Sequence, residues 1–158
     1  MSPLAHGEPG VRETEVVTVL RPRGERVAQT SPLQTAARRA LGAFLVGAGT
    51  GHLTFVRREF QGQVPPWVPM DPDDVVLLSG AVEIALGSAL IALPKERVRV
   101  GTVAAAFFTA IFPGNISQYR QRRDALGLDT DRKRFLRLFA QPVLVALALW
   151  STGTLPRR

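Results

Sequence analysis

Glu83 is the residue that most clearly points to chemistry, because it is the one charged side chain in the apolar stretch 75–94. A lone charge inside a bilayer costs at least about 2.5 kcal/mol, so such a residue is by default a functional-site candidate. Gly80 and Gly87 stand three residues before it and four residues after it, on the same helix face. Small residues on that face predict packing against another helix. The structural alternative is a protonated or hydrogen-bonded glutamate that holds two helices together.

Three further polar side chains lie near the ends of other apolar stretches: His52, Asn115 and Gln141. At a rise of about 1.5 Å per residue, His52 and Asn115 lie about 6 Å from the ends of their stretches. Counted from the starts of their own stretches, Glu83 lies about 12 Å deep and Gln141 about 5 Å deep. Because successive spans run in opposite directions, all four side chains are expected in one half of the bilayer, as a shared polar cluster.

A histidine beside a glutamate with little access to water can relay a proton, because imidazole titrates near neutral pH. The same pair can bind the carbonyl and hydroxyl groups of a quinone, with Asn115 and Gln141 as neutral donors. Quinone is therefore the one candidate cofactor. The alternative for His52 is a hydrogen-bonded interfacial residue, and for both amides it is helix–helix hydrogen bonding. No metal site is expected, since the chain has no cysteine and two histidines.

Four apolar stretches, at residues 40–56, 75–94, 100–119 and 138–156, contain no charged side chain besides Glu83. The segregation predicts an all-α fold, a four-helix transmembrane bundle with spans at about 38–56, 74–94, 98–118 and 135–153. These spans form one membrane domain, 36–156, after a disordered polar tail, 1–35. A soluble nucleic-acid binder is not expected, despite the net charge of +7.

Local signals set the expected helix ends. Asp71 and Pro72 are a typical N-cap and first residue for the second helix, and Pro94 marks its end. We expect Pro113-Gly114 to break the hydrogen-bond ladder of the third helix and to kink it, and residues 120–137 to form a long basic linker. Gly47 and Gly51 form a small-xxx-small pair that suits a close helix contact.

The charges of the loops indicate an orientation. The short turn at residues 95–99 has three basic residues and one acidic residue, whereas the loop between the first two spans has two basic and four acidic residues. Positive residues favour the cytoplasmic side. We therefore expect a multi-pass inner-membrane protein with both termini in the cytoplasm.

Four short segments resemble the successive signatures of the DoxX-like membrane proteins: GHLTF at 51–55, VPPWVP at 64–69, SGAVEIALG at 79–87 and FPGN at 112–115. The resemblance covers residues 38–152. It implies four helices, with His52, Glu83 and Asn115 as signature polar positions. It also implies association with membrane oxidoreductases, since some relatives accompany thiosulfate:quinone oxidoreductase, methylamine utilisation or oxidative-stress complexes.

On that resemblance, the expected function is an accessory or quinone-facing subunit of a membrane oxidoreductase system. Its partners would be the lipid bilayer and a redox subunit, and a homo-oligomer is compatible with the sequence. The first alternative is a non-enzymatic assembly or interaction protein, in which the polar residues hold the bundle together and the basic linker recruits anionic lipid. A small-solute or proton transporter is the third class. The residues by themselves specify no reaction.

Overall fold

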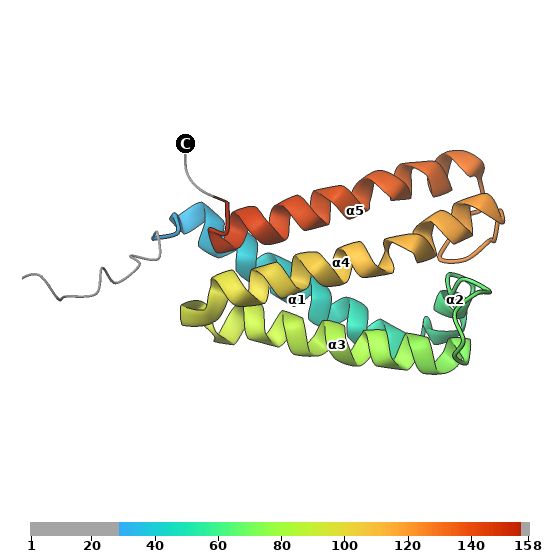
Figure 1. Cartoon of the computed structure of the whole chain (residues 1–158), viewed down its shortest axis with the longest axis horizontal. Coiled ribbons are helices and arrows are strands. Elements are labelled where there is room, and N and C mark those ends of the chain that lie inside the picture. The colour runs from blue at the N-terminus through green and yellow to red at the C-terminus, as the bar shows by residue number, and fades with distance from the viewer. Residues whose placement is uncertain (1–28, 156–158) are drawn as a thin grey trace, which may run out of the picture.

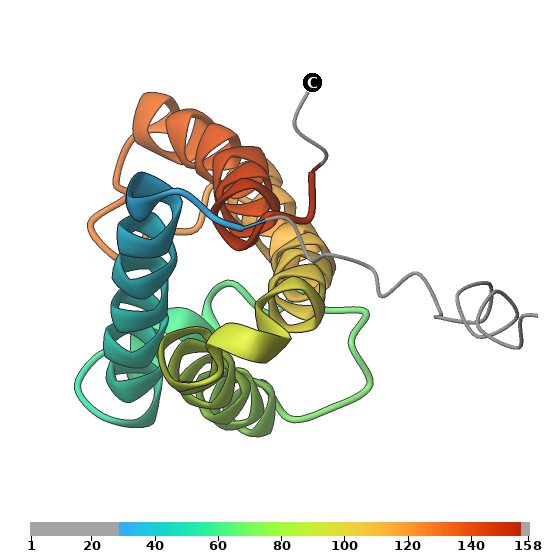
Figure 2. The same cartoon turned by 90° about the vertical axis from the view of Figure 1, so that its left-hand side faces the viewer.

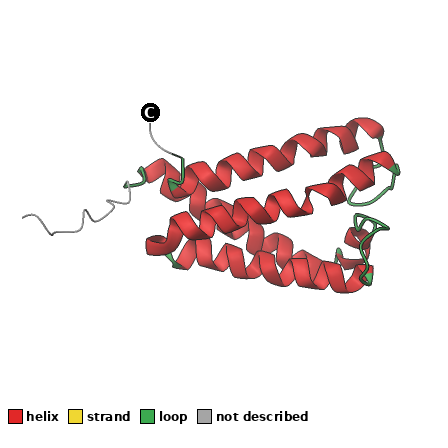
Figure 3. Cartoon of the chain, in the orientation of Figure 1, coloured by secondary structure: helices red, strands yellow, loops and turns green. Residues whose placement is uncertain are grey.

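A computed structural model describes residues 29–155, and this part of the chain is all-helical (Figure 3). The expectation of an all-α fold is thereby confirmed. The helices are, in chain order, α1 (Pro32–Leu53), the short α2 (Arg57–Gln61), α3 (Pro72–Ala92), the 3₁₀ turn η2 (Pro94–Glu96), α4 (Arg97–Arg120) and α5 (Asp131–Thr152). Residues 1–28 of the expected tail lie outside the described part.

The four long helices form a ring in the order α3, α1, α5, α4, as the end-on view in Figure 2 shows. The closest partners are α1 with α3, and α4 with α5. The start of α1, the η2 turn and the end of α5 lie together at one end of the bundle (Figure 1). At the other end lie α2 and the linker between α4 and α5, and there the two helix pairs diverge. We call these the terminal end and the linker end.

Capping residues explain where the helices begin. Asp71 caps α3, accepting a hydrogen bond from the backbone N–H of Asp73, and Pro72 is the first residue, as predicted. The predicted tail boundary at residue 35 is wrong, because α1 already begins at Pro32. Ser31 and Gln34 form a capping box there, each side chain bonding the other's backbone N–H.

Pro113 lies inside α4, which continues through it to Arg120, close to the predicted end of this span at residue 118. Proline removes the backbone donor that would bond the Thr109 carbonyl, and a helix tolerates this loss where a neighbouring helix packs against it. Here α5 is bonded to α4 close by, since the Gln141 amide donates to the Phe108 carbonyl at 2.7 Å. The expected linker of residues 120–137 is likewise shorter, because α5 starts at Asp131, capped by Thr130.

Glycines bring α1 and α3 into close contact. A Cβ at Gly49 would stand 2.5 Å from the Gly80 carbonyl oxygen, and one at Gly42 would stand 2.7 Å from that of Gly87. Each helix thus places a glycine every seven residues at the contact. The predicted pairing through Gly47 and Gly51 is wrong: Gly47 faces open space, and Gly51 faces its own chain at Val56.

Polar and apolar residues are distributed as expected for a helical bundle in lipid. Many large apolar side chains are exposed, among them Phe55, Phe139 and Val143, while several polar and charged ones are buried. In the described residues, α3, α4 with η2, and α5 are long and apolar enough to cross a membrane. α1 is long enough but less apolar, since it carries Arg38 and Arg39.

The apolar core occupies the half of the bundle toward the terminal end. Its fully enclosed members come from all four long helices: Leu45 of α1, Leu90 of α3, Ala104 of α4 and Ala148 of α5. Phe108 marks the border of this core. Beyond it, toward the linker end, the bundle encloses a cavity.

Candidate functional site

The cavity has a volume of about 450 Å³ and lies between the two helix pairs. That volume is within the range of small-molecule binding sites. Its walls are mostly apolar, and all four polar residues singled out from the sequence line it: His52, Glu83, Asn115 and Gln141. The four residues form two separate groups, which differ in how completely their polar atoms are bonded.

The first group is His52 of α1 and Glu83 of α3, which are 6% and 5% exposed. The His52 Nδ1 atom lies 3.0 Å from the Glu83 Oε2 atom. The two atoms are in contact without the geometry of a hydrogen bond, and Glu83 Oε2 has no other hydrogen-bond partner. The His52 Nε2 atom has no partner either. This wall of the cavity therefore presents an imidazole nitrogen and a carboxyl oxygen that are both buried and unsatisfied.

Helix packing brings these two residues together. The Cβ of His52 lies directly against the backbone of Gly80, where an added Cβ would stand 2.8 Å away. A larger residue at position 80 would hold α1 away and separate the pair. Ser79 contributes a weak contact, with its hydroxyl 3.4 Å from His52 Nδ1. The ring of Phe60 in α2 meets the His52 ring edge-on, with centroids 3.7 Å apart.

The second group lies on α4 and α5 and is hydrogen-bonded in series. The Arg137 Nε atom donates to the Asn115 side-chain oxygen at 3.3 Å. The Asn115 amide donates to the Gln141 side-chain oxygen at 3.0 Å, and the Gln141 amide donates to the Phe108 carbonyl. Asn115 and Gln141 therefore hold two helices together, which is the structural alternative considered for them.

Arg137 is a cavity residue that the sequence analysis did not single out, since it was counted with the basic linker. The spacing of the sequence could have identified it, because Arg137 and Gln141 are four residues apart and therefore share one face of α5. Its positive charge lies close enough to act on Glu83. The cavity thus has a cationic wall at Arg137 opposite the His52–Glu83 wall.

The linker end of the cavity is covered by α2, the loop after it and the α4–α5 linker. The Arg57 Nε atom donates to Asp73 Oδ1 at 2.6 Å, and this bond raises the pKa of Arg57. Gln63 donates to Gln118 at 3.0 Å, which ties the loop to α4. Trp67 also lines the cavity, although 70% of its surface is exposed.

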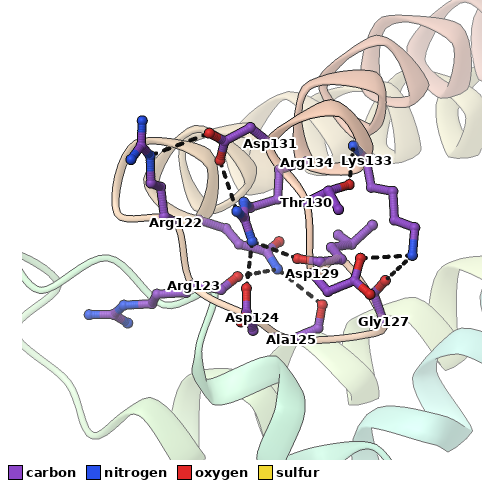
Figure 4. A network of polar contacts seen from close by, with 12 residues as sticks. Arg122, Arg123, Asp124, Ala125, Gly127, Asp129, Thr130, Asp131, Lys133 and Arg134 are labelled. Carbon is purple, nitrogen blue, oxygen red and sulfur yellow. Dashed lines mark hydrogen bonds and ion pairs between the residues drawn. The ribbon is translucent and has the colours of Figure 1, made fainter.

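The α4–α5 linker is held by its own ion pairs, shown in Figure 4. Arg134, only 6% exposed, donates to the carboxylates of Asp124 at 2.6 Å and Asp131 at 2.8 Å. Lys133 pairs with Asp129 at 2.7 Å, and that hydrogen bond lowers the pKa of Asp129. Part of the basic charge expected to recruit anionic lipid is thus paired within the linker, where Arg122, Lys133 and Arg134 contact aspartates.

Over residues 41–152 the sequence matches a family described as a domain of unknown function, DUF8561. That match includes α3, α4 and α5 entire, α1 from residue 41, and every residue of the cavity named above. The chain belongs to this family. No curated protein sequence and no solved structure matches it.

The resemblance to DoxX-like proteins is wrong, because the matching family is DUF8561 and not a DoxX family. The segments that suggested it reflect requirements common to tightly packed helical bundles. Gly80 and Gly87 permit the α1–α3 contact, and prolines stand at loops and helix starts. The roles that the resemblance implied for His52, Glu83 and Asn115 are withdrawn with it.

Proposed function

We propose that this protein is a four-span membrane protein that binds a quinone in the cavity between its helix pairs. The observation that carries the proposal is the coincidence of a mostly apolar cavity with unsatisfied polar atoms at His52 and Glu83. In the proposal α1 is the fourth span, and both termini face the cytoplasm.

The chemistry of a quinone suits the two walls. Its ring is apolar and planar, and its two carbonyl oxygens point in opposite directions. One carbonyl oxygen would accept a hydrogen bond from His52 Nε2, and the other would face the Arg137 guanidinium. In the reduced form, a hydroxyl would donate to Glu83 Oε2. Buried polar atoms left without partners cost about 1–3 kcal/mol each, so a ligand that satisfies them gains affinity.

The apolar tail of a quinone also has a route out of the bundle. A shallow groove runs between α1 and α5 and shares Phe44 and Leu144 with the cavity. Phe44 is 55% exposed, so this opening faces the outer surface of the bundle. A tail lying there would reach lipid while the ring stays in the cavity.

In this proposal the His52–Glu83 pair moves protons and a redox partner subunit supplies electrons. Reduction of a quinone to a quinol consumes two electrons and two protons. The imidazole and the carboxyl, with Nδ1 and Oε2 3.0 Å apart, would form a two-site relay that delivers one of these protons to the carbonyl oxygen at His52. Water would supply the proton for the second oxygen, which the Arg137 guanidinium faces as a hydrogen-bond donor only.

The test is quenching of tryptophan fluorescence by a short-chain quinone. The chain has two tryptophans, and only Trp67 lines the cavity, so a Trp150→Phe background leaves one reporter at the site. In detergent, quenching should saturate with quinone concentration. Adding His52→Phe should raise the Kd about tenfold, because one hydrogen bond is lost.

The matched control is Thr50→Val, on the exposed side of α1 two residues from His52. The Thr50 hydroxyl bonds only the Val46 carbonyl within its own helix, so quenching should be unchanged. Quenching that rises linearly without saturation, equally in all variants, would mean partitioning into the micelle and would refute the proposal.

A second candidate function is the non-enzymatic assembly protein. The observation in its favour is the hydrogen-bond series Arg137–Asn115–Gln141–Phe108, which satisfies its members without any ligand. It predicts that His52 and Glu83 variants change stability and leave every quinone measurement unaltered.

A further inference from the structure

A buried cation lies far from the cavity, at the terminal end of the bundle. Arg38 of α1 is 2% exposed, and two of its three guanidinium nitrogens, Nε and Nη1, are enclosed and have no hydrogen-bond partner. A buried charge without a partner destabilises a protein by several kcal/mol. Something outside the described chain is therefore needed to balance it.

Helix packing places Arg38 near the start of α4. Gly42 of α1 packs against Gly87 and Ile91 of α3, and Arg38 lies one helical turn before Gly42. It is thus level with the last turn of α3, which ends at Ala92 just before the η2 turn and α4. One turn earlier in α1, the Gln34 amide donates to the Trp150 carbonyl near the end of α5 at 2.8 Å.

The surroundings of Arg38 add positive charge. The side chains of Arg39 and Arg97 are close enough to act on it electrostatically. Arg97 is the first residue of α4, whose N-terminus has no side-chain cap and no acidic residue in its first turn. A helix N-terminus carries a partial positive charge. The one acidic side chain of the neighbouring turn, Glu96, is already paired with Arg99 at 3.0 Å.

We propose that Arg38, together with Arg97 and the start of α4, binds one phosphate-type oxyanion, as carried by a membrane lipid headgroup or by free phosphate. Arginine matches phosphate oxygens with paired N–H donors, and a helix N-terminus adds backbone donors. The oxyanion would supply the acceptors that Arg38 Nε and Nη1 lack. This site lies at the opposite end of the bundle from the cavity and does not depend on the quinone proposal.

The experiment compares the full chain with Arg38→Met in a maltoside detergent, which contains no phosphate. Thermal unfolding is measured alone, with added phosphatidylglycerol, and with inorganic phosphate. Without phosphate, Arg38→Met should be at least as stable as the natural sequence, because an unpaired buried charge is removed. Saturating phosphatidylglycerol should raise the midpoint of the natural sequence by roughly 5 °C and leave Arg38→Met unchanged.

The control is Arg39→Met, which removes the same charge from the adjacent, exposed position. It should keep most of the stabilisation by lipid. A shift with phosphatidylglycerol alone identifies a lipid headgroup, and an equal shift with inorganic phosphate identifies free phosphate. Equal shifts in Arg38→Met and the natural sequence, or no shift in either, would overturn the proposal.

A second measurement covers the case in which Arg38→Met is not recovered folded. Arg38→Lys keeps the charge but loses the paired donors, so it should retain the fold and bind more weakly. Native mass spectrometry should then show one tightly held phosphatidylglycerol on the natural sequence and on Arg39→Met. Its occupancy should be several-fold lower on Arg38→Lys, and equal occupancy on all three would contradict the assignment.

Discussion

At the residue scale, the cavity separates polar side chains that bond one another from polar side chains that do not. Asn115 and Gln141 use their amides within the protein. His52 Nε2 and Glu83 Oε2 remain without hydrogen-bond partners although both residues are buried. The hydrogen bonds of Asn115 and Gln141 are explained by helix packing alone. His52 and Glu83 can still form hydrogen bonds to a ligand or exchange a proton. Substitutions at the two pairs should therefore have different consequences.

Replacing Glu83 by Gln tests the proton role. The variant keeps the size and hydrogen-bonding ability of the side chain but removes the titrating proton. We expect normal abundance in the membrane and loss of complementation in a deletion strain. Glu83→Leu should instead lower abundance, because it leaves His52 without its neighbour. Full complementation by Glu83→Gln at normal abundance would show that Glu83 does not act in proton transfer.

Replacing Gln141 by Leu should destabilise the bundle whether or not a ligand binds. The change leaves the Asn115 amide buried without its acceptor, at a cost of about 1–3 kcal/mol, and also removes the bond to the Phe108 carbonyl. Thermal unfolding in detergent measures the effect. The control is Gln29→Leu, at an exposed position before α1, which should be close to neutral. Equal stability of the two variants would show that the series of hydrogen bonds contributes little.

At the element scale, the position of Glu83 depends on how closely α1 approaches α3. The glycine pairs Gly49–Gly80 and Gly42–Gly87 allow backbone contact along the whole interface. That contact brings His52 against α3, one turn from Glu83. The α4–α5 pair is held differently, by Gly101 against Thr152 near the terminal end and by the amide series near the linker end.

Two glycine-to-alanine substitutions in α1 distinguish the effect of the close α1–α3 contact on stability from the effect of helix propensity. Gly49→Ala would place a Cβ 2.5 Å from the Gly80 carbonyl oxygen, so overpacking should cost about 1–3 kcal/mol. Gly47→Ala, two residues away, meets nothing within 4 Å and should stabilise the helix by about 0.5–1 kcal/mol. Unfolding midpoints in detergent compare them, and a Gly49→Ala variant as stable as Gly47→Ala would refute the packing argument.

The linker between α4 and α5 should owe its order to Arg134. Arg134→Gln removes the ion pairs to Asp124 and Asp131 and the bond to the Leu128 carbonyl. Amide hydrogen exchange of residues 121–130 should accelerate several-fold. Arg132→Gln, an exposed neighbour with the same change in charge, should leave exchange unaltered. Similar rates in both variants would mean that the ion pairs do not order the linker.

At the scale of the whole molecule, the two ends of the bundle have different characters. The core fills the terminal half, where Arg38 is enclosed, and the cavity occupies the linker half, where the helix pairs diverge (Figure 1). The terminal end carries the basic turn of Lys95, Arg97 and Arg99. The proposed orientation places that end in the cytoplasm and the mouth of the cavity toward the other side.

Single cysteines can test this topology, because the natural chain contains none. With a membrane-impermeant maleimide on intact cells, Asp129→Cys in the linker should be labelled. Glu96→Cys in the α3–α4 turn and Gln29→Cys before α1 should react only after lysis. Labelling of Gln29→Cys on intact cells, with Glu96→Cys protected, would show that α1 does not cross the membrane. Labelling of Glu96→Cys on intact cells would reverse the orientation.

What the sequence by itself determined was local. Apolar runs interrupted by one charge predicted four long helices, and the Asp71-Pro72 cap placed the start of α3. Helix rise, together with the alternating direction of the spans, also placed His52, Glu83, Asn115 and Gln141 in one half of the bilayer. Each of these inferences depends on residues within a few turns of one another, where hydrogen bonding and hydropathy are set by the neighbouring sequence.

Only the tertiary structure decided which polar atoms remained free. Pro113 was expected to break the hydrogen-bond ladder of its helix, and α4, packed against α5 and bonded to it through Gln141 and the Phe108 carbonyl, continues to Arg120. Arg137 was expected to belong to the basic linker, and the ring of helices placed it on the cavity wall, while the same packing enclosed Arg38 of α1. These outcomes depend on contacts between distant helices, whose register is set by glycines such as Gly49 and Gly80 meeting across the interface.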